Sequence, residues 1–218
     1  MGCDAAMKRF PPFPRLRHGA DLRTLVLVAL ALVSLAVGWS GVWLHPLVIP
    51  LSGVLAFVCC IAVHNHMHLP VFRDRFWNSV FQLLVMFGSG QPPTGIISAH
   101  NERHHGDPDS EHDFVRTSLA RSRWNFLNLL VFPFLSIAAM LREKPDDLSR
   151  WKAARPRLYR QAVLERSVFY SALGLLLVLD WQATLLFLVT PWLGAQLTLV
   201  AVNLLQHPVS YTHLTLPT

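Results

Sequence analysis

Histidines gather in two short clusters of the sequence. His64 and His68 stand four residues apart, His100 and His104 have the same spacing, and His105 follows directly. Residues four apart on a helix share one face, so each pair can hold one metal ion between its imidazoles. Neutral imidazole is a good ligand for iron, copper, zinc and nickel. These five histidines are therefore the first candidates for a metal centre.

The other histidines are weaker candidates for metal ligands. His66 lies about 200° around a helix from His64, so we expect its side chain to face away from the pair. His112 follows the second cluster in a polar stretch, where a solvated or substrate-facing role is expected. Glu102, inside the second cluster, is equally well explained as a partner that orients an imidazole or as a solvated carboxylate. Solvated positions are expected for the two remaining histidines of the N-terminal part, His18 and His45.

The composition indicates a membrane protein. Of the 218 residues, 52% are hydrophobic and only 15% are charged, whereas soluble domains carry about 25% charged residues. The net charge of +6 comes from Lys and Arg residues that stand in blocks beside apolar segments. Such blocks are typical of loops on the cytoplasmic side of a membrane. Nucleic acid is therefore not an expected partner.

Long apolar runs predict two transmembrane helical hairpins. Residues 24–44 are long enough to cross a bilayer, and residues 47–63 carry the chain back. Residues 167–205 contain one charged residue, Asp180, near which a second hairpin is expected to turn. Its first arm is short unless the helix begins before Ser167. The expected fold class is an all-α integral membrane protein.

The segments between the hairpins are expected to lie on the cytoplasmic side. Residues 76–97 predict a short interfacial or re-entrant helix, and residues 124–141 a helix in or on the inner interface. The acidic stretch 107–113 and the basic stretch 142–166 are interpreted as solvated faces. The basic face is also suited to anionic lipid headgroups or to an acidic electron donor. This topology puts both termini and the histidine clusters in the cytoplasm.

Three segments together resemble a known family of enzymes. HNHMH at 64–68 and HNERHH at 100–105 resemble the first two histidine boxes of the membrane fatty acid desaturase and hydroxylase superfamily, and NLLQH at 203–207 resembles its NxxxH element. The resemblance implies that His207 is a further iron ligand and that Asn203 holds a water near the second iron. It covers about residues 24–208 and implies a cytosolic di-iron site.

The resemblance also implies a reaction and its partners. It implies two iron ions, O₂ as co-substrate, and oxidation of an unactivated C–H bond in a lipid acyl chain. It further implies an electron donor such as ferredoxin or a cytochrome b5 type protein, and a place in a bacterial inner membrane with the active site facing the cytoplasm. A hydroxylase or ketolase acting on alkanes or carotenoids carries the same boxes and stays open. A metal transporter is disfavoured because the spans 24–44, 47–63 and 183–205 contain no ionisable residue.

The sequence suggests three regions and an incomplete site. We expect a basic cytosolic N-terminus at 1–23, a membrane desaturase-like domain at 24–207, and a truncated or non-native tail at 208–218. The family's third histidine box is expected after the NxxxH element, and nothing in the tail matches it. Two irons need more ligands than the six predicted ligand histidines can supply, which are His64, His68, His100, His104, His105 and His207. The expectation is that this chain, as it stands, inserts into a membrane but does not catalyse the reaction.

Overall fold

The computed structural model describes residues 13–42, 46–97, 110, 113–121, 125–143 and 147–206. Within these residues the regular secondary structure is helical, apart from one isolated β-bridge between Leu16 and Phe72. The helices, in chain order, are α1 (Asp21–Ser40), α2 (Val48–His68), α3 (Arg75–Ser89), α4 (Thr94–Ile97), the 3-10 turn η2 (Thr117–Leu119), α5 (Asn125–Glu143), α6 (Asp147–Ala154), α7 (Pro156–Leu179), α8 (Trp181–Thr184), the π-helical segment η3 (Leu185–Val189) and α9 (Thr190–Gln206).

Four helices are long and apolar enough to cross a membrane. They are α1, α2, α7 and the continuous run Trp181–Leu205 formed by α8, η3 and α9. Much of their outward surface is apolar, as at Leu30, Val33, Leu175 and Val178, and such side chains suit contact with lipid. The prediction of an all-α membrane protein with two helical hairpins is confirmed.

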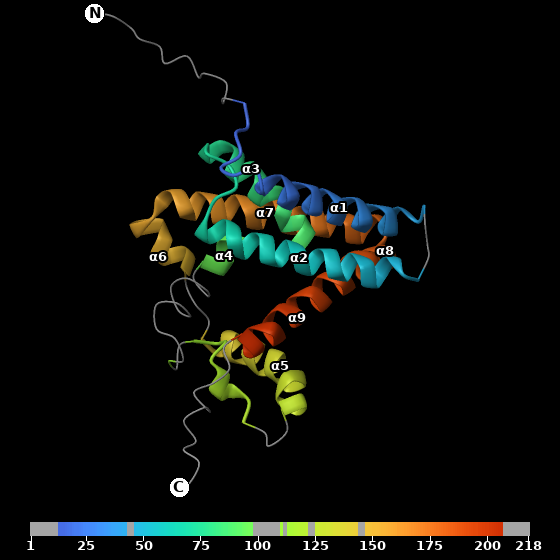
Figure 1. The fold of residues 1–218 in the computed structure, drawn as a ribbon, viewed down its shortest axis with the longest axis vertical. Coiled ribbons are helices and arrows are strands. Elements are labelled where there is room, and N and C mark those ends of the chain that lie inside the picture. Colours follow the sequence, from blue (N-terminus) through green and yellow to red (C-terminus); the bar gives the residue numbers. More distant parts are fainter. Residues whose placement is uncertain are drawn as a thin grey trace, which may run out of the picture.

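Both hairpins turn at the same end of the molecule. α1 ends at Gly41, whose φ of 70° is left-handed, and α7 ends at Asp180, whose carboxylate accepts a hydrogen bond from Ala183 N. Trp39 Nε1 donates to Thr184 Oγ1 over 2.9 Å, so the turn of one hairpin is tied to the turn of the other. We call this the turn end; it lies at the right of Figure 1, and α2 and α9 run back from it.

The first arm of the second hairpin is longer than its apolar run. From the sequence, this arm was expected to be short unless its helix began before Ser167. The helix does begin earlier, since α7 starts at Pro156. Proline suits the first position of a helix, because the backbone N–H that it lacks would have no partner within the helix there. The early turns of α7 carry Arg157 and Arg160, which are exposed. A basic extension therefore lengthens this arm at the end opposite the turns.

Helix α3 is inserted among the four spans. It packs against α1, α2, α7 and α9, and its residues Phe81, Val85 and Met86 are buried. The predicted helix is therefore present, and its interfacial or re-entrant place in the bilayer stays a prediction. Gly88 permits the insertion, because a Cβ at that position would lie 2.6 Å from Cys59 Sγ.

Two buried clusters hold this bundle together. One joins α1, α2 and α3 around Val28, Cys59 and Val85. The other joins both hairpins around Met86 and Trp192. Among helices in lipid, close packing and hydrogen bonds replace the hydrophobic effect as the source of association. The side-chain hydrogen bond of 2.6 Å between Ser34 of α1 and Ser52 of α2 is one such contact.

Helix α5 is not part of either hairpin and lies against one arm of the second. It packs against α9 and carries Pro133 in its interior, and Figure 1 shows it beside the far end of α9. Its apolar part, Phe126–Met140, is shorter than the four spans. The predicted helix at 124–141 is therefore present, and its place at the inner interface stays a prediction.

Candidate metal centre

The first histidine cluster forms the last turns of α2. The helix runs without interruption to His68, so the helical interpretation of residues 64–68 is confirmed. The ring centroids of His64 and His68 lie 4.9 Å apart, with the ring planes inclined at 64°. His64 is half-buried and His68 is exposed. Two imidazoles on one helix face at this separation suit a shared metal ion.

His66 faces the protein interior and is not part of this pair. Its side chain is 3% exposed, and its ring centroid lies 4.9 Å from that of Phe81 in α3. Its Nδ1 accepts a hydrogen bond of 3.3 Å from the backbone N–H of Val71. His66 therefore packs α2 against α3 and fixes the chain that leaves α2. Its side chain faces away from the His64–His68 pair, as predicted.

The chain before α1 fixes the end of α2 from outside. Arg17 N donates to Val71 O over 2.8 Å, and Arg73 N donates to Arg15 O over 3.0 Å. The guanidinium Nε of Arg17 donates to Pro70 O over 3.0 Å. These contacts hold the segment after His68 in place and bring three arginines to the end of α2 that carries the histidine pair. We call this end of the molecule the histidine end.

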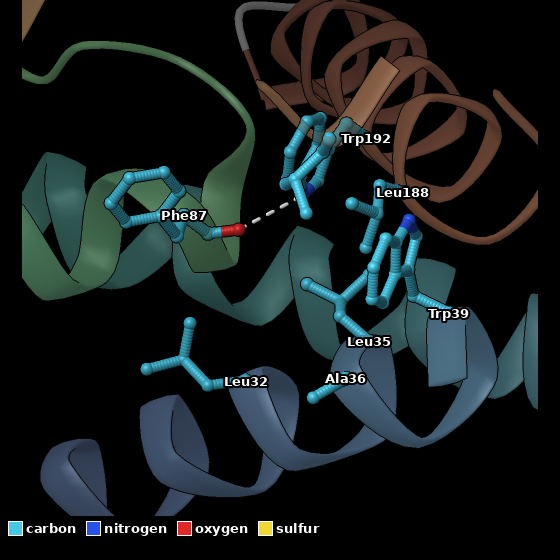
Figure 2. Close-up of a pocket in the computed structure, with 8 residues that line it drawn as sticks. Leu32, Leu35, Ala36, Trp39, Phe87, Leu188 and Trp192 are labelled. Atoms are coloured by element: carbon cyan, nitrogen blue, oxygen red, sulfur yellow. Dashed lines mark hydrogen bonds between the residues drawn. The ribbon is translucent and has the colours of Figure 1, made fainter. Parts of the chain in front are cut away.

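The backbone after α3 leaves helical geometry within the bundle, and side chains of α9 satisfy it. Figure 2 shows Trp192 Nε1 donating to Phe87 O, over 2.9 Å. Gln196 Nε2 donates to Ser89 O and Gly90 O over 3.3 and 3.2 Å. Irregular backbone at membrane depth is tolerated only where the protein supplies such partners. The chain can therefore turn back toward the histidine end after α3.

The returning chain forms α4, whose first residue is bound by Glu165 of α7. Thr94 N donates to Glu165 Oε2, and Thr94 Oγ1 donates to Glu165 Oε1, each over 2.8 Å. Gln161 Nε2 donates to Glu165 Oε1 over 2.9 Å. Glu165 is fully buried, so the interpretation of residues 142–166 as a solvated face is wrong for this residue, because it has donors inside the bundle.

The acidic stretch 107–113 needs the same correction at its last residue. Asp113 is 1% exposed, and its Oδ1 accepts a hydrogen bond of 3.0 Å from Val115 N. A solvated face was predicted for it from its acidic neighbours. The carboxylate instead has a backbone partner within the turn that precedes η2.

Asn203 lies in the last turns of α9. Its Nδ2 is buried and has no hydrogen-bond partner among the described atoms. A buried amide without a partner costs free energy unless a water or another ligand satisfies it. α9 runs back from the turn end, packs against α2 and α5, and ends beside α5 (Figure 1), so Asn203 lies in the part of α9 that is farthest from the turns. An amide of this kind is suited to hold a water.

The remaining predicted ligands, His100, His104, His105 and His207, lie outside the described residues, as do Glu102, His112 and His45. His18 is described and exposed, as predicted. Within the part of the chain that the structure describes, no group of three or more His, Cys, Asp or Glu side chains converges. The imidazole pair fits a nitrogen-ligated iron centre by the chemistry of its donors, and Asn203 Nδ2, which has no partner among the described atoms, has an N–H to donate to a water.

An apolar groove of about 200 Å³ lies between the two hairpins. Figure 2 shows it lined by side chains of α1, α3 and the second hairpin, among them Leu32, Leu35 and Leu188. Its lining holds no acid, base or metal ligand. The two tryptophans in it donate their N–H groups to Thr184 and Phe87. The groove can hold apolar groups, and reactive groups lie elsewhere.

Sequence reasoning missed the side chains that hold the segment after α3, which are Glu165, Gln196 and Trp192. Gln196 carried a signal, because a polar residue within an apolar span needs a polar partner. Glu165 carried no signal of burial that would distinguish it from the many charged residues around it in the sequence. Its burial follows from a contact with Thr94, which is 71 residues away in the sequence.

Comparison with known proteins gives one match. The family model described as Fatty acid desaturase matches residues 41–216, which is more than half of the chain. The matched region begins at the turn after α1 and contains both histidine clusters and Asn203. No curated protein and no solved structure matches the chain.

Proposed function

The chain belongs to the fatty acid desaturase family, and on that ground we propose that it is an O₂-dependent desaturase of lipid acyl chains. Membership itself makes the protein a membrane oxidoreductase of the desaturase and hydroxylase type. The observation that supports a metal-dependent reaction is the pairing of His64 and His68, whose rings lie 4.9 Å apart on one face of α2.

The proposed metal ligands come from three parts of the chain. His64 and His68 hold one side of the site, and the helix fixes the direction of both rings. Asn203 holds a water through its buried Nδ2, which has no other partner among the described atoms. Two iron ions bound there would activate O₂, the oxidant, so that an unactivated C–H bond can be broken. The further proposed ligands are the histidines of the second cluster and the NxxxH element, His100, His104, His105 and His207.

The histidine end is proposed to face the cytoplasm of a bacterial cell. Arg15, Arg17 and Arg73 lie around the end of α2, and the early turns of α7 carry exposed Arg157 and Arg160. Short loops with excess Lys and Arg remain on the cytoplasmic side. The same charges suit an acidic electron donor of the ferredoxin or cytochrome b5 type.

A product assay separates desaturation from its nearest alternative. The protein is expressed from its complete open reading frame in a bacterial host, and membrane lipids are analysed by mass spectrometry after growth under isotopically labelled O₂. Desaturation gives new double bonds without label in the lipid, whereas a hydroxylase or ketolase incorporates labelled oxygen. The matched variants are His64→Ala, which should lose the product, and His18→Ala, which replaces an exposed histidine and should keep it. Equal product from both variants would contradict the proposed site.

A further inference from the structure

Glu165 is a buried carboxylate to which the proposed reaction gives no role. It is fully buried, and both of its oxygens accept hydrogen bonds from the same residue, Thr94. Removing a carboxylate from water is costly unless donors replace the solvent. Here the donors are one backbone N–H, one hydroxyl and the amide of Gln161. The arrangement therefore binds one point of the chain to α7.

The bound point is the start of the segment that leads into the second histidine cluster. Thr94 is the first residue of α4, and α4 ends at Ile97, three residues before His100 in the sequence. A helix of four residues does not hold its shape or position by its own hydrogen bonds. Its place depends on what fixes its ends, and Glu165 satisfies the N–H group that begins it.

A neighbouring contact supports the same function for this part of α7. The side chain of Arg166 lies beside α4, since a Cβ at Gly95 would be 3.9 Å from its Nη2. Thr94 itself is 1% exposed. Two consecutive residues of α7 thus lie against the first two residues of α4, and this contact is at the opposite end of the bundle from the hairpin turns.

We propose that Glu165 is a positioning residue that fixes where the chain enters the second histidine cluster, and so fixes how that cluster meets a metal ion held by His64 and His68. The part of the proposal that concerns metal rests on the proposed function. The attachment of α4 to α7 does not. A merely structural role for Glu165 would lower stability without a specific effect on metal binding.

The test compares variants of the attachment with a matched hydrogen-bond loss at the turn end. Glu165→Ala removes both carboxylate oxygens that accept from Thr94. Thr94→Val removes the hydroxyl while keeping the side-chain shape, and Thr94→Ser keeps the hydroxyl while removing the methyl group. Trp39→Phe is the control, because it removes the inter-helix hydrogen bond to Thr184. Each purified full chain is measured for unfolding temperature, for iron(II) bound per protein, and for hydrogen exchange of peptides that cover residues 91–97.

Glu165→Ala and Thr94→Val should speed exchange at residues 94–97 by about tenfold or more, because the lost hydrogen bonds no longer oppose local opening. Both should bind less iron than Trp39→Phe at the same loss of unfolding temperature, and Thr94→Ser should recover wild-type binding. Wild-type iron binding in Thr94→Val would overturn the positioning role, and this variant decides the matter if Glu165→Ala does not fold. Absence of iron from the wild-type protein, expressed from its complete open reading frame, would instead contradict the proposed function.

Discussion

The two ends of the bundle use their polar groups differently. At the turn end, the polar side chains are satisfied by neighbours within the turns: Asp180 caps the next helix, and Trp39 donates to the hydroxyl of Thr184, which is fully buried. At the histidine end, the buried polar groups include ionisable ones. Glu165 and His66 lie in the interior, and the amide of Asn203 is buried without a partner among the described atoms.

This difference supports the proposal that the histidine end carries the chemistry. Polar groups inside a membrane protein are costly, so they are retained mainly where they serve a function. The turn end needs only to reverse the chain, and a glycine and an aspartate accomplish that. The histidine end must fix several segments in register, and its buried carboxylate and imidazole supply the directed contacts that apolar side chains lack.

The largest expected effect is an all-or-none difference in labelling between the two ends. In a chain carrying Cys3→Ser, a cysteine at Val42 should react with an impermeant thiol reagent added outside intact cells, and a cysteine at Arg73 should not. Both positions are exposed, whereas Cys59 and Cys60 are buried. The basic residues near Arg73 favour the proposed cytoplasmic location of that end. Reaction at Arg73 from outside, with none at Val42, would reverse the proposed orientation.

The next effect concerns metal at the histidine end. His64→Ala or His68→Ala should each lower iron affinity by more than the about 10–100-fold typical of residues that only orient a ligand. His66→Ala is the internal control: it should lower the unfolding temperature, because the packing on Phe81 and the bond to Val71 are lost, and it should leave iron binding intact. Metal content by mass spectrometry measures both. Equal loss of iron in all three variants would show that the pairing on one face of α2 is irrelevant.

The parts of the fold that could be predicted are those set by local sequence. The i, i+4 spacing of His64 and His68, the turn at Asp180 and the direction of His66 follow from helical periodicity and apolar length. The attachment of Thr94 to Glu165 could not be predicted, because it joins residues far apart in the sequence. A buried glutamate in a basic segment also has the composition of a solvated one, and only its partners distinguish the two.

A smaller effect separates backbone conformation from packing. Gly41 and Gly90 both have positive φ, at 70° and 73°. Gly41→Ala at the turn end meets nothing within 4 Å and should cost about 1–2 kcal/mol, the strain of a left-handed residue. At Gly90 the added Cβ would lie 2.1 Å from Trp192 Cγ. Gly90→Ala should therefore cost the same backbone strain and, in addition, about 1–3 kcal/mol or more of folding free energy from overpacking.

The pair of glycine variants is measured by thermal unfolding in one detergent. Gly90→Ala should unfold at the lower temperature and, because α4 follows Gly90 closely in the chain, should also bind less iron. If both variants unfold at the same temperature, the close approach of α9 to the end of α3 is not part of the folded protein.

The smallest expected effect is that of Trp39→Phe at the turn end. The substitution keeps an aromatic ring in the groove between the hairpins but removes the N–H that donates to Thr184 Oγ1. The Thr184 hydroxyl can still donate to Leu176 O or Asp180 O, so no buried donor is left without an acceptor. Hydrogen bonds between membrane helices contribute about 0.6 kcal/mol on average, and a loss of that size should lower the unfolding temperature slightly. Iron binding should equal that of the wild type, because the contact lies at the opposite end from His64 and His68. A double-mutant cycle with Thr184→Val isolates the energy of the pair. A loss of iron in Trp39→Phe as large as in Thr94→Val would mean that the two ends are coupled through the hairpins, and the division between a turn end and a histidine end would no longer hold.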